Sequence, residues 1–245
     1  MVLGNIIGIQ KCGLSLWWLV LIGFIYSLIL FYGCYFIQAN FFLKVHNKGI
    51  TSKKIIALTF DDGPDDNTTS KILLILKEKK VKATFFCIGK RIAGNELIIQ
   101  QMHLDQHLIG NHSYSHHFWF DVFSVNKMLK DLQKTDILIN QITGNKPIYF
   151  RPPYGVTNPN VAKTIKIGKY IPIGWNVRSM DTISKNPEQL ISKLKNAICP
   201  GAIILLHDTM NITVSILPLL IEEIKANGYT FVRVDELLNL DIKPT

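Results

Sequence analysis

Thr59-Phe60-Asp61-Asp62-Gly63-Pro64 is the stretch that decides the fold of this chain, because two adjacent carboxylates stand between an apolar run and a Gly-Pro turn. The run before them, residues 54–58, has the composition of a buried strand. Successive strand residues point to opposite faces, so both acids can aim at one point only where the backbone turns at a strand end. Paired carboxylates in such a place indicate a metal ion, a proton-transfer role, or both.

A second motif, His112-Ser113-Tyr114-Ser115-His116, supplies two imidazoles four residues apart. Histidines at this spacing reach one ion if the segment makes a helical turn. Together with Asp62 they form a three-ligand set with an open position, which is typical of catalytic rather than structural zinc. The sequence therefore predicts Asp62, His112 and His116 as ligands of a divalent metal ion, zinc first, with cobalt as a substitute.

Strand-like and helix-like segments alternate after residue 54. The expected strands are Ile55–Phe60, Ala83–Ile88, His107–Gly110, Ile148–Phe150, Tyr170–Asn176, Ala202–Leu206 and Thr230–Val234. The expected helices are Thr68–Lys80, Asn95–Gln106, Phe123–Ile142, Pro159–Ile167, Pro187–Ile198 and Val214–Asn227. This alternation predicts an α/β fold in which about seven parallel strands form an incomplete barrel wrapped by helices, with the functional groups at the carboxyl ends of the strands.

The motifs resemble those of the polysaccharide deacetylases of carbohydrate esterase family 4, the NodB homology domain that also occurs in the chitooligosaccharide deacetylase of rhizobia. That family carries five motifs in fixed order, and the acid pair and the histidine pair match the first two. Arg151-Pro152-Pro153-Tyr154-Gly155 matches the third, and Leu205-Leu206-His207 matches the fifth. The resemblance covers roughly residues 52 to 240 and implies a distorted (β/α) barrel.

The resemblance also implies a role for each matched side chain. Asp61 is the expected general base, and Arg151 is expected to hold it ionised and oriented. His207 is the expected general acid for the leaving amine. The backbone N–H of Tyr154 is expected to stabilise an oxyanion, and Leu205 to line a pocket for the acetyl methyl group.

The fourth motif of the family, Asp-x-x-Asp-Trp, is matched only in part. Arg178 stands where the first acid would adjust the acidity of His207, and Thr182 replaces the tryptophan. Asp181 remains and is expected in the catalytic site. Trp175 is expected either to replace the lost aromatic wall of the substrate pocket or to pack in the core.

Phe118-Trp119-Phe120 follows the metal-site histidines directly. Aromatic rings pack against the apolar faces of sugars, so these residues are expected to form either a sugar-stacking platform or the buried side of a loop.

The N-terminal part of the chain differs in composition from the rest. Residues 14–37 are uncharged and apolar, long enough for a transmembrane helix. The boundaries expected from composition are a short N-terminal segment at residues 1–13, a membrane anchor at 14–38, a basic linker at 39–53 and a deacetylase domain at 54–240. A cleaved signal peptide is the alternative to an anchor.

The net charge of +9 is concentrated near this span, because residues 1–60 contain five lysines and no acid. No arginine-rich stripe or nucleic-acid motif is present, so a nucleic-acid partner is not expected. The lysines after the span favour a cytoplasmic domain by the positive-inside rule. A polysaccharide substrate favours the outside, and long domains cross membranes with little regard to charge. We expect a single-pass membrane protein with its catalytic domain outside the cytoplasm.

The residues and the resemblance together predict metal-dependent removal of N-acetyl groups from an amino-sugar polymer: chitooligosaccharide, peptidoglycan or exopolysaccharide. Two alternatives stay open, namely hydrolysis of a non-sugar amide and a glycan-binding pseudoenzyme. The incomplete fourth motif favours the pseudoenzyme. The complete set of base, metal-ligating and acid residues favours the enzyme.

Overall fold

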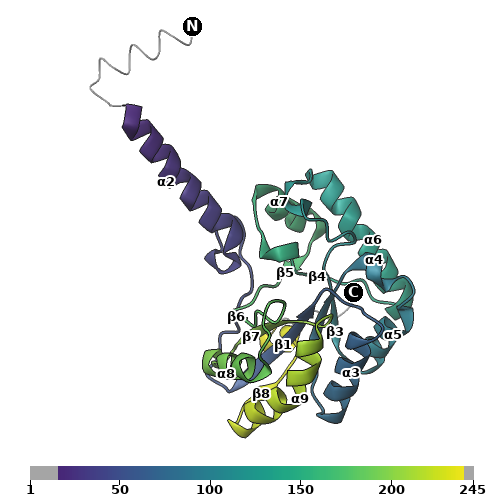
Figure 1. The fold of residues 1–245 in the computed structure, drawn as a ribbon. Coiled ribbons are helices and arrows are strands. Elements are labelled where there is room, and N and C mark those ends of the chain that lie inside the picture. The colour runs from purple at the N-terminus through teal and green to yellow at the C-terminus, as the bar shows by residue number, and fades with distance from the viewer. Residues whose placement is uncertain (1–15, 240–245) are drawn as a thin grey trace.

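The computed structural model describes residues 16–239, and its centre is one sheet of short parallel strands (Figure 1). The strands are β1 (Ile55–Asp61), β2 (Thr84–Cys87), β3 (Leu108–Asn111), β4 (Tyr149–Phe150), β5 (Ile171–Pro172), β6 (Val177–Arg178), β7 (Ile203–His207) and β8 (Thr230–Phe231). Their order is β5-β4-β3-β2-β1-β7-β6, and β8 pairs with the start of β1. The predicted parallel α/β barrel is confirmed.

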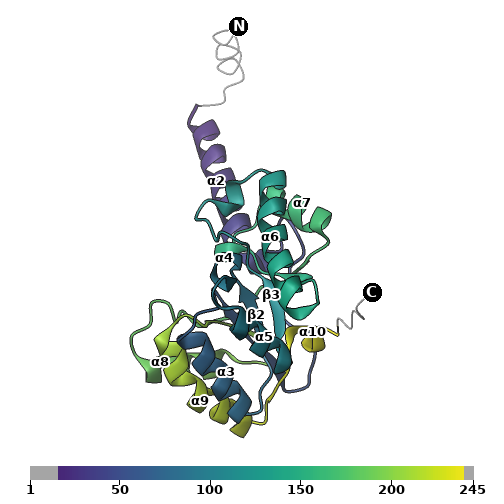
Figure 2. The ribbon, with the colours of Figure 1, turned by 90° about the vertical axis from the view of Figure 1, so that its right-hand side faces the viewer.

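Helices cover the outside of this sheet (Figures 1 and 2). They are α3 (Thr68–Glu78), α4 (Gly89–Ile92), α5 (Glu96–Leu104), α6 (Val125–Thr143), α7 (Pro159–Gly168), α8 (Pro187–Ala197), α9 (Asn211–Ala226) and α10 (Val234–Leu237). The six predicted helices are all present, with boundaries shifted by a few residues. The short helices α4 and α10 carry too little apolar periodicity to be found from the sequence.

Side chains of β1 alternate between the helical layer and the barrel interior. Ile56, Leu58 and Phe60 belong to the large core cluster shared with the surrounding helices. Thr59 and Asp61 point the other way, since both accept hydrogen bonds from one buried arginine. The period of two therefore aims the first acid of the pair into the barrel.

The barrel is closed by a short segment rather than by the single strand predicted at Tyr170–Asn176. Strands β5 and β6 lie at opposite ends of the sheet, although only residues 173–176 separate them. At one end Ile173 N donates to Phe150 O at 2.9 Å, and at the other Asn176 N donates to Ile203 O at 3.2 Å. One continuous strand cannot form here, because its two halves pair with different edges of the sheet.

Residues before β1 fill the remaining gap in the wall. His46 N donates to Pro172 O at 3.0 Å, and Gly49 N donates to Gly201 O at 2.8 Å. Val45 and Ile37 are buried in the interior cluster. Open sheet edges leave backbone groups without partners, and this segment satisfies some of them. Residues 45–49 thus lie in the barrel wall, where the sequence indicated a linker.

Helix α2 (Leu16–Tyr35) projects away from the barrel in both views (Figures 1 and 2). It is long and apolar enough to cross a membrane, and Gly33 is its only buried residue. Leu14 and the short segment at 1–13 lie outside the described residues. The far end of the helix is held to the domain, because Thr157 N donates to Cys34 O at 2.9 Å.

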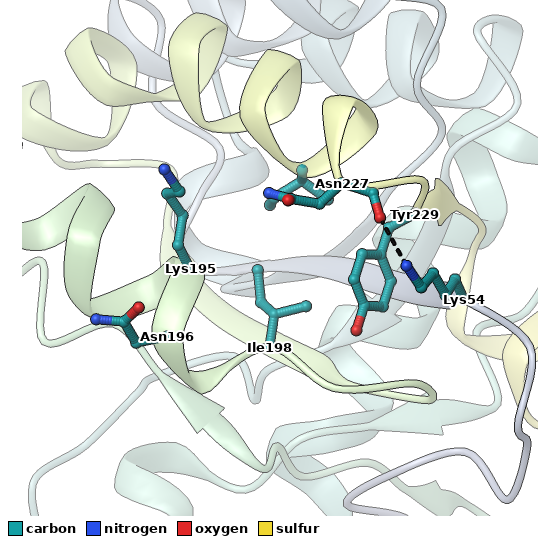
Figure 3. Close-up of a pocket in the computed structure, with 7 residues that line it drawn as sticks. Lys54, Lys195, Asn196, Ile198, Asn227 and Tyr229 are labelled. Atoms are coloured by element: carbon teal, nitrogen blue, oxygen red, sulfur yellow. Dashed lines mark hydrogen bonds between the residues drawn. The ribbon is translucent and has the colours of Figure 1, made fainter.

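Figure 3 shows a pocket at the amino ends of the strands. Lys54 directly precedes β1 and Tyr229 directly precedes β8, and the lysine Nζ donates to Asn227 O at 3.0 Å. The sequence motifs follow the carboxyl ends of the strands. This pocket is therefore at the opposite end of the barrel from the chemistry.

Candidate active site

The motif residues come together at the carboxyl ends of the strands. Asp61 ends β1 and His207 ends β7, and the two are register partners on neighbouring strands. His112 follows β3 directly, Arg151 follows β4, and Asp181 lies in the loop after β6. The parallel arrangement thus delivers side chains from five strands to one edge of the barrel.

Asp62, His112 and His116 form a compact cluster whose potential ligand atoms all lie within 4.8 Å of one another. Asp62 Oδ1 is 3.5 Å from His112 Nε2 and 3.3 Å from His116 Nε2. Two ligand atoms at tetrahedral positions around a zinc ion are about 3.4 Å apart, given metal–ligand distances of ~2.0–2.2 Å. Both separations from Asp62 are close to this value, so the donor set suits a divalent ion.

The segment from His112 to His116 is not the helical turn that the spacing suggested. Ser113 and His116 adopt the left-handed conformation, with φ of 64° and 44°. Side chains hold this loop: Asn111 Oδ1 accepts from Ser113 N at 2.7 Å, and Ser113 Oγ accepts from His116 N at 3.0 Å. Such strained backbone persists where its surroundings fix it, and it is enriched at functional sites.

Asp131 on α6 is a second support of the same loop, and no sequence motif marks it. Its Oδ1 accepts from Tyr114 N at 2.7 Å and from Ser115 N at 3.2 Å. A lone aspartate on an amphipathic helix looks like any solvated residue of that face.

The protonation of the cluster also suits a metal. His112 Nδ1 lies 2.8 Å from Arg151 O, so this nitrogen carries a proton and Nε2 faces the cluster. Burial, together with the neighbouring His112, lowers the pKa of His116 to about 4. Burial alone would raise the pKa of Asp62, but the hydrogen bond and charge of His112 lower it below its usual range. Burial lowers the pKa of His112, but the carboxylates of Asp61 and Asp62 outweigh it and raise that pKa, so an ion that binds here would displace a proton from His112. The neutral imidazole of His116 and the ionised carboxylate of Asp62 are already in the forms that bind a metal.

Asp61 is held by a fully buried arginine. Arg151 Nη1 donates to Asp61 Oδ1 at 2.7 Å and to Thr59 Oγ1 at 2.8 Å. Its other nitrogens donate to the carbonyls of Ile173 and Gly174. The side chain of Arg151 is 0% exposed, so its charge acts on Asp61 with little screening. Asp61 Oδ2, the oxygen that Arg151 does not bind, lies 3.9 Å from His112 Nε2.

His207 is paired with Asp181. Its Nδ1 lies 2.7 Å from Asp181 Oδ1, and its backbone N–H donates to Asp181 Oδ2 at 2.7 Å. Ser179 Oγ and Thr213 Oγ1 also donate to this carboxylate. Burial alone would lower the pKa of His207, but the Asp181 hydrogen bond and charge outweigh it and raise that pKa to about 9.

This pairing corrects the expectation drawn from the incomplete fourth motif. The family's fourth motif places the acid that adjusts the pKa of His207 at position 178. In this chain Asp181 supplies that carboxylate instead. The Arg178 side chain is exposed, with its guanidinium 5.9 Å from the centre of the Trp175 ring. Trp175 is buried in the interior cluster, and a Cβ added at Gly155 would lie 2.4 Å from its ring. This geometry favours core packing for Trp175.

Arg178→Asp is accordingly expected to leave the pH dependence of activity unchanged. The guanidinium of Arg178 lies over the ring of Trp175. No hydrogen bond or ion pair joins it to His207 in the described part of the chain. Rates measured from pH 5 to 10 for the wild type and the variant should overlay. A shift of the alkaline limb in the variant would show that Arg178 does reach His207.

Tyr154 lies at the rim of the site. Its backbone is left-handed, with φ of 59°, and its ring centre is 4.8 Å from that of His116. Phe118 continues the contact, with its ring centre 6.0 Å from that of Tyr154. Phe118 and Trp119 are exposed, whereas Phe120 is buried, so the expected loop burial holds for Phe120 alone.

Asp208 is a buried residue that the sequence reasoning missed. Burial raises its pKa to about 7, and it accepts a hydrogen bond from Thr69 Oγ1 at 2.7 Å. Its carboxyl presses against the turn after the acid pair, where a Cβ on Gly63 would lie 1.9 Å from Asp208 Oδ2. Only glycine fits this approach. Its place directly after the last motif was the available signal.

Comparison with known proteins extends these observations. The family model described as polysaccharide deacetylase matches residues 48–170. A peptidoglycan-N-acetylglucosamine deacetylase of Bacillus cereus is 36% identical over 196 residues, covering 76% of this chain and 89% of the relative. The peptidoglycan-N-acetylglucosamine deacetylase PgdA of Listeria monocytogenes is also 36% identical, but the chain spans only 40% of its length.

Solved structures agree with this relationship. An acetyl xylan esterase of family 4 from Clostridium thermocellum, in complex with cobalt, aligns with a TM-score of 0.71 at 35% identity, covering 76% of this chain and 91% of the other. A family 4 pseudoenzyme from Bacillus anthracis aligns with a TM-score of 0.73 at 31% identity, covering 78% and 67%. The chain therefore belongs to the polysaccharide deacetylase family, carbohydrate esterase family 4.

Proposed function

We propose that the protein is a metal-dependent deacetylase that removes N-acetyl groups from an amino-sugar polymer, with peptidoglycan as the first candidate. One observation carries this proposal: Asp61 and His207 are register partners beside the metal-binding cluster. Arg151 binds the carboxylate of Asp61, and Asp181 binds the imidazole of His207. The peptidoglycan deacetylases among the relatives support the choice of polymer.

In this proposal Asp62, His112 and His116 hold the ion, zinc or in its place cobalt. The chemistry that a divalent ion supplies here is polarisation of the acetyl carbonyl and a lowered pKa of water. The cobalt in the acetyl xylan esterase supports a divalent metal.

The side chains around the ion then divide the proton transfers. Asp61 accepts the proton of the attacking water, and Arg151 holds that carboxylate in its orientation. The backbone N–H of Tyr154 stabilises the negative oxygen, and Leu205 lines the space for the acetyl methyl group. His207 gives its proton to the sugar nitrogen as the C–N bond breaks, which leaves acetate and a free amine. Asp181 keeps His207 protonated and in the orientation that this step needs.

The residues argue against a binding-only protein. A pseudoenzyme of the same family is among the similar structures. A glycan-binding module, however, does not require a buried arginine that binds the carboxylate of Asp61. Nor does it require a buried carboxylate that binds the imidazole of His207. A non-sugar amide remains the alternative substrate class, since the same proton transfers serve any acetamide.

Acetate release tests the proposal. The full chain in detergent or lipid discs is expected to release acetate from N-acetylated peptidoglycan fragments or chitooligosaccharides. A chelator should abolish this release and added zinc or cobalt should restore it. A metal-loaded protein that releases no acetate from these N-acetylated polymers would exclude the proposal, and release from small amides alone would favour the alternative.

His116→Ala is expected to lower metal content and acetate release together, because it removes one of three ligands. Metal content is measured by elemental analysis after dialysis. His103→Ala is the matched control, since His103 is exposed on α5. Full metal occupancy in His116→Ala would contradict the ligand assignment.

A further inference from the structure

We propose that the loop at residues 117–123, here called the aromatic loop, rests on an anionic bilayer surface beside α2, so that the active site opens at the membrane. This inference rests on the proposed function only for the identity of the site. It adds where the substrate is met: the enzyme acts on glycan held close to the bilayer.

The aromatic loop presents apolar side chains outward from a fixed backbone. Phe120 and Phe123 are buried in a core cluster with residues of α6 and α7. Trp119 and Val122, three residues apart around the short 3-10 helix at Phe120–Val122, are 58% and 61% exposed. Side chains at this spacing in a 3-10 helix lie on the same side. Apolar residues held outward by an anchored loop mark an interaction surface rather than disorder.

Hydrogen bonds connect this loop to the end of α2 through two adjacent residues. Thr157 N donates to Cys34 O at 2.9 Å, and Thr157 Oγ1 donates to Gly33 O at 3.3 Å. The next residue, Asn158, donates from Nδ2 to Asp121 O at 2.6 Å. The aromatic loop is therefore held at a short, fixed distance from the last turn of α2.

The length of α2 places this last turn at the membrane surface. Twenty residues of helix span about 30 Å, which is the thickness of the hydrocarbon core. Tyr32 and Tyr35 are exposed at its end, where interfacial aromatic residues are expected. When α2 crosses the bilayer, the carbonyls that hold Thr157 lie at the interface, and the aromatic loop lies there with them.

Charge near the same end of the helix complements an anionic surface. The segment that follows α2 forms a groove with α7, lined by Phe42 and Leu43 together with Lys44, Lys163 and Lys166. Lysines close to a membrane attract anionic lipid headgroups, while apolar neighbours contact the acyl boundary.

The aromatic loop leads directly to the proposed metal site. The rings of Trp119 and Phe118 are in contact, Phe118 contacts Tyr154, and Tyr154 contacts His116, with successive ring centres 4.8, 6.0 and 4.8 Å apart. A loop seated on the bilayer thus turns the open side of the site towards the membrane surface.

Tryptophan fluorescence tests the contact without reference to activity. The chain has four tryptophans, and Trp17→Phe with Trp18→Phe leaves only Trp119 and the buried Trp175. In lipid discs containing phosphatidylglycerol, lipids brominated near the headgroup are expected to quench Trp119. Adding Trp119→Phe should abolish the quenching, because Trp175 lies in the core. Emission as insensitive to brominated lipid as that of Trp175 would overturn the proposal, as would a Trp119 signal that responds to glycan and not to lipid.

A rate comparison tests the consequence for the substrate. Val122→Ser should lower acetate release from glycan tethered to anionic vesicles by about tenfold, from the lost apolar contact with the bilayer. Release from a soluble oligosaccharide should stay within about twofold of the wild type. Leu219→Ser, an exposed apolar change on α9, is the control. Equal losses on both substrates would overturn the membrane role, whereas no release by any form, the unmodified chain included, would instead count against the proposed function.

Discussion

Asp61→Asn is expected to keep its metal and to lose acetate release by ~10²–10⁴-fold, the usual scale of general base catalysis. Asparagine keeps the size of the side chain but cannot accept the proton of the attacking water. Its carbonyl oxygen still accepts a hydrogen bond from Arg151, which is 2.7 Å from Asp61 Oδ1 in the wild type. The pocket should therefore stay intact while the rate falls.

Substitution of the neighbouring acid, Asp62, is expected to change metal binding before it changes the rate. Asp62→Asn removes the charged oxygen that faces both imidazoles, at 3.5 and 3.3 Å, so metal affinity should fall first. The measurement is metal content by elemental analysis together with single-turnover acetate release at saturating zinc. Asp66→Asn, at an exposed acid of the same loop, is the control. Equal metal binding by Asp61→Asn and Asp62→Asn would remove the distinction between base and ligand.

The difference between these two acids shows what a sequence reveals and what it leaves open. The pair, its place after a strand and the need for a turn are visible from residue types alone. The structure adds the turn itself, because Asp62 adopts a φ of 79° directly after the last residue of β1. Alternation along β1 then explains why Asp61 points at Arg151. Strand periodicity predicts this direction once the buried partner is known.

Long, strongly patterned elements were predictable, and short ones that depend on distant partners were not. The amphipathic helices α3 and α5 to α9 follow from local periodicity. Strand β6 has two residues, and it forms because β7 offers an edge. The same holds for residues 45–49, whose basic composition resembles a linker while their backbone pairs with residues near β5 and β7. Pairing with a remote edge leaves no trace in local composition.

The supports of the site were the least predictable part. Asn111 and Asp131 shape the histidine loop through hydrogen bonds that they accept from backbone N–H groups, and Asp208 packs behind the turn at Gly63. Residues of this kind are recognised only when the fold places them next to a motif. The motif also pointed to position 178, held by Arg178, as the site of the partner of His207, whereas the partner is Asp181. Spacing along the chain cannot tell which of several neighbouring side chains faces His207.

His207 and Asp181 offer the second large effect. His207→Ala is expected to lower acetate release by ~10²–10⁴-fold, since it removes the group proposed to protonate the leaving amine. Asp181→Asn should act on pH dependence instead. A general acid works only while protonated, so the wild-type rate should fall as the pH rises through about 9, the raised pKa of His207.

Without the Asp181 carboxylate, burial is opposed only by the smaller effects of Asp61 and Asp62, so the pKa of His207 should fall from about 9. The alkaline limb of Asp181→Asn should therefore move to lower pH, with part of the lost rate recovered in acid. His103→Ala again serves as the control. Overlaying profiles for the wild type and Asp181→Asn would mean that His207 does not titrate in the rate-limiting step. Full activity in His207→Ala would transfer the acid role to another group, and the pairing of β1 with β7 would then no longer bring the proposed base and acid together.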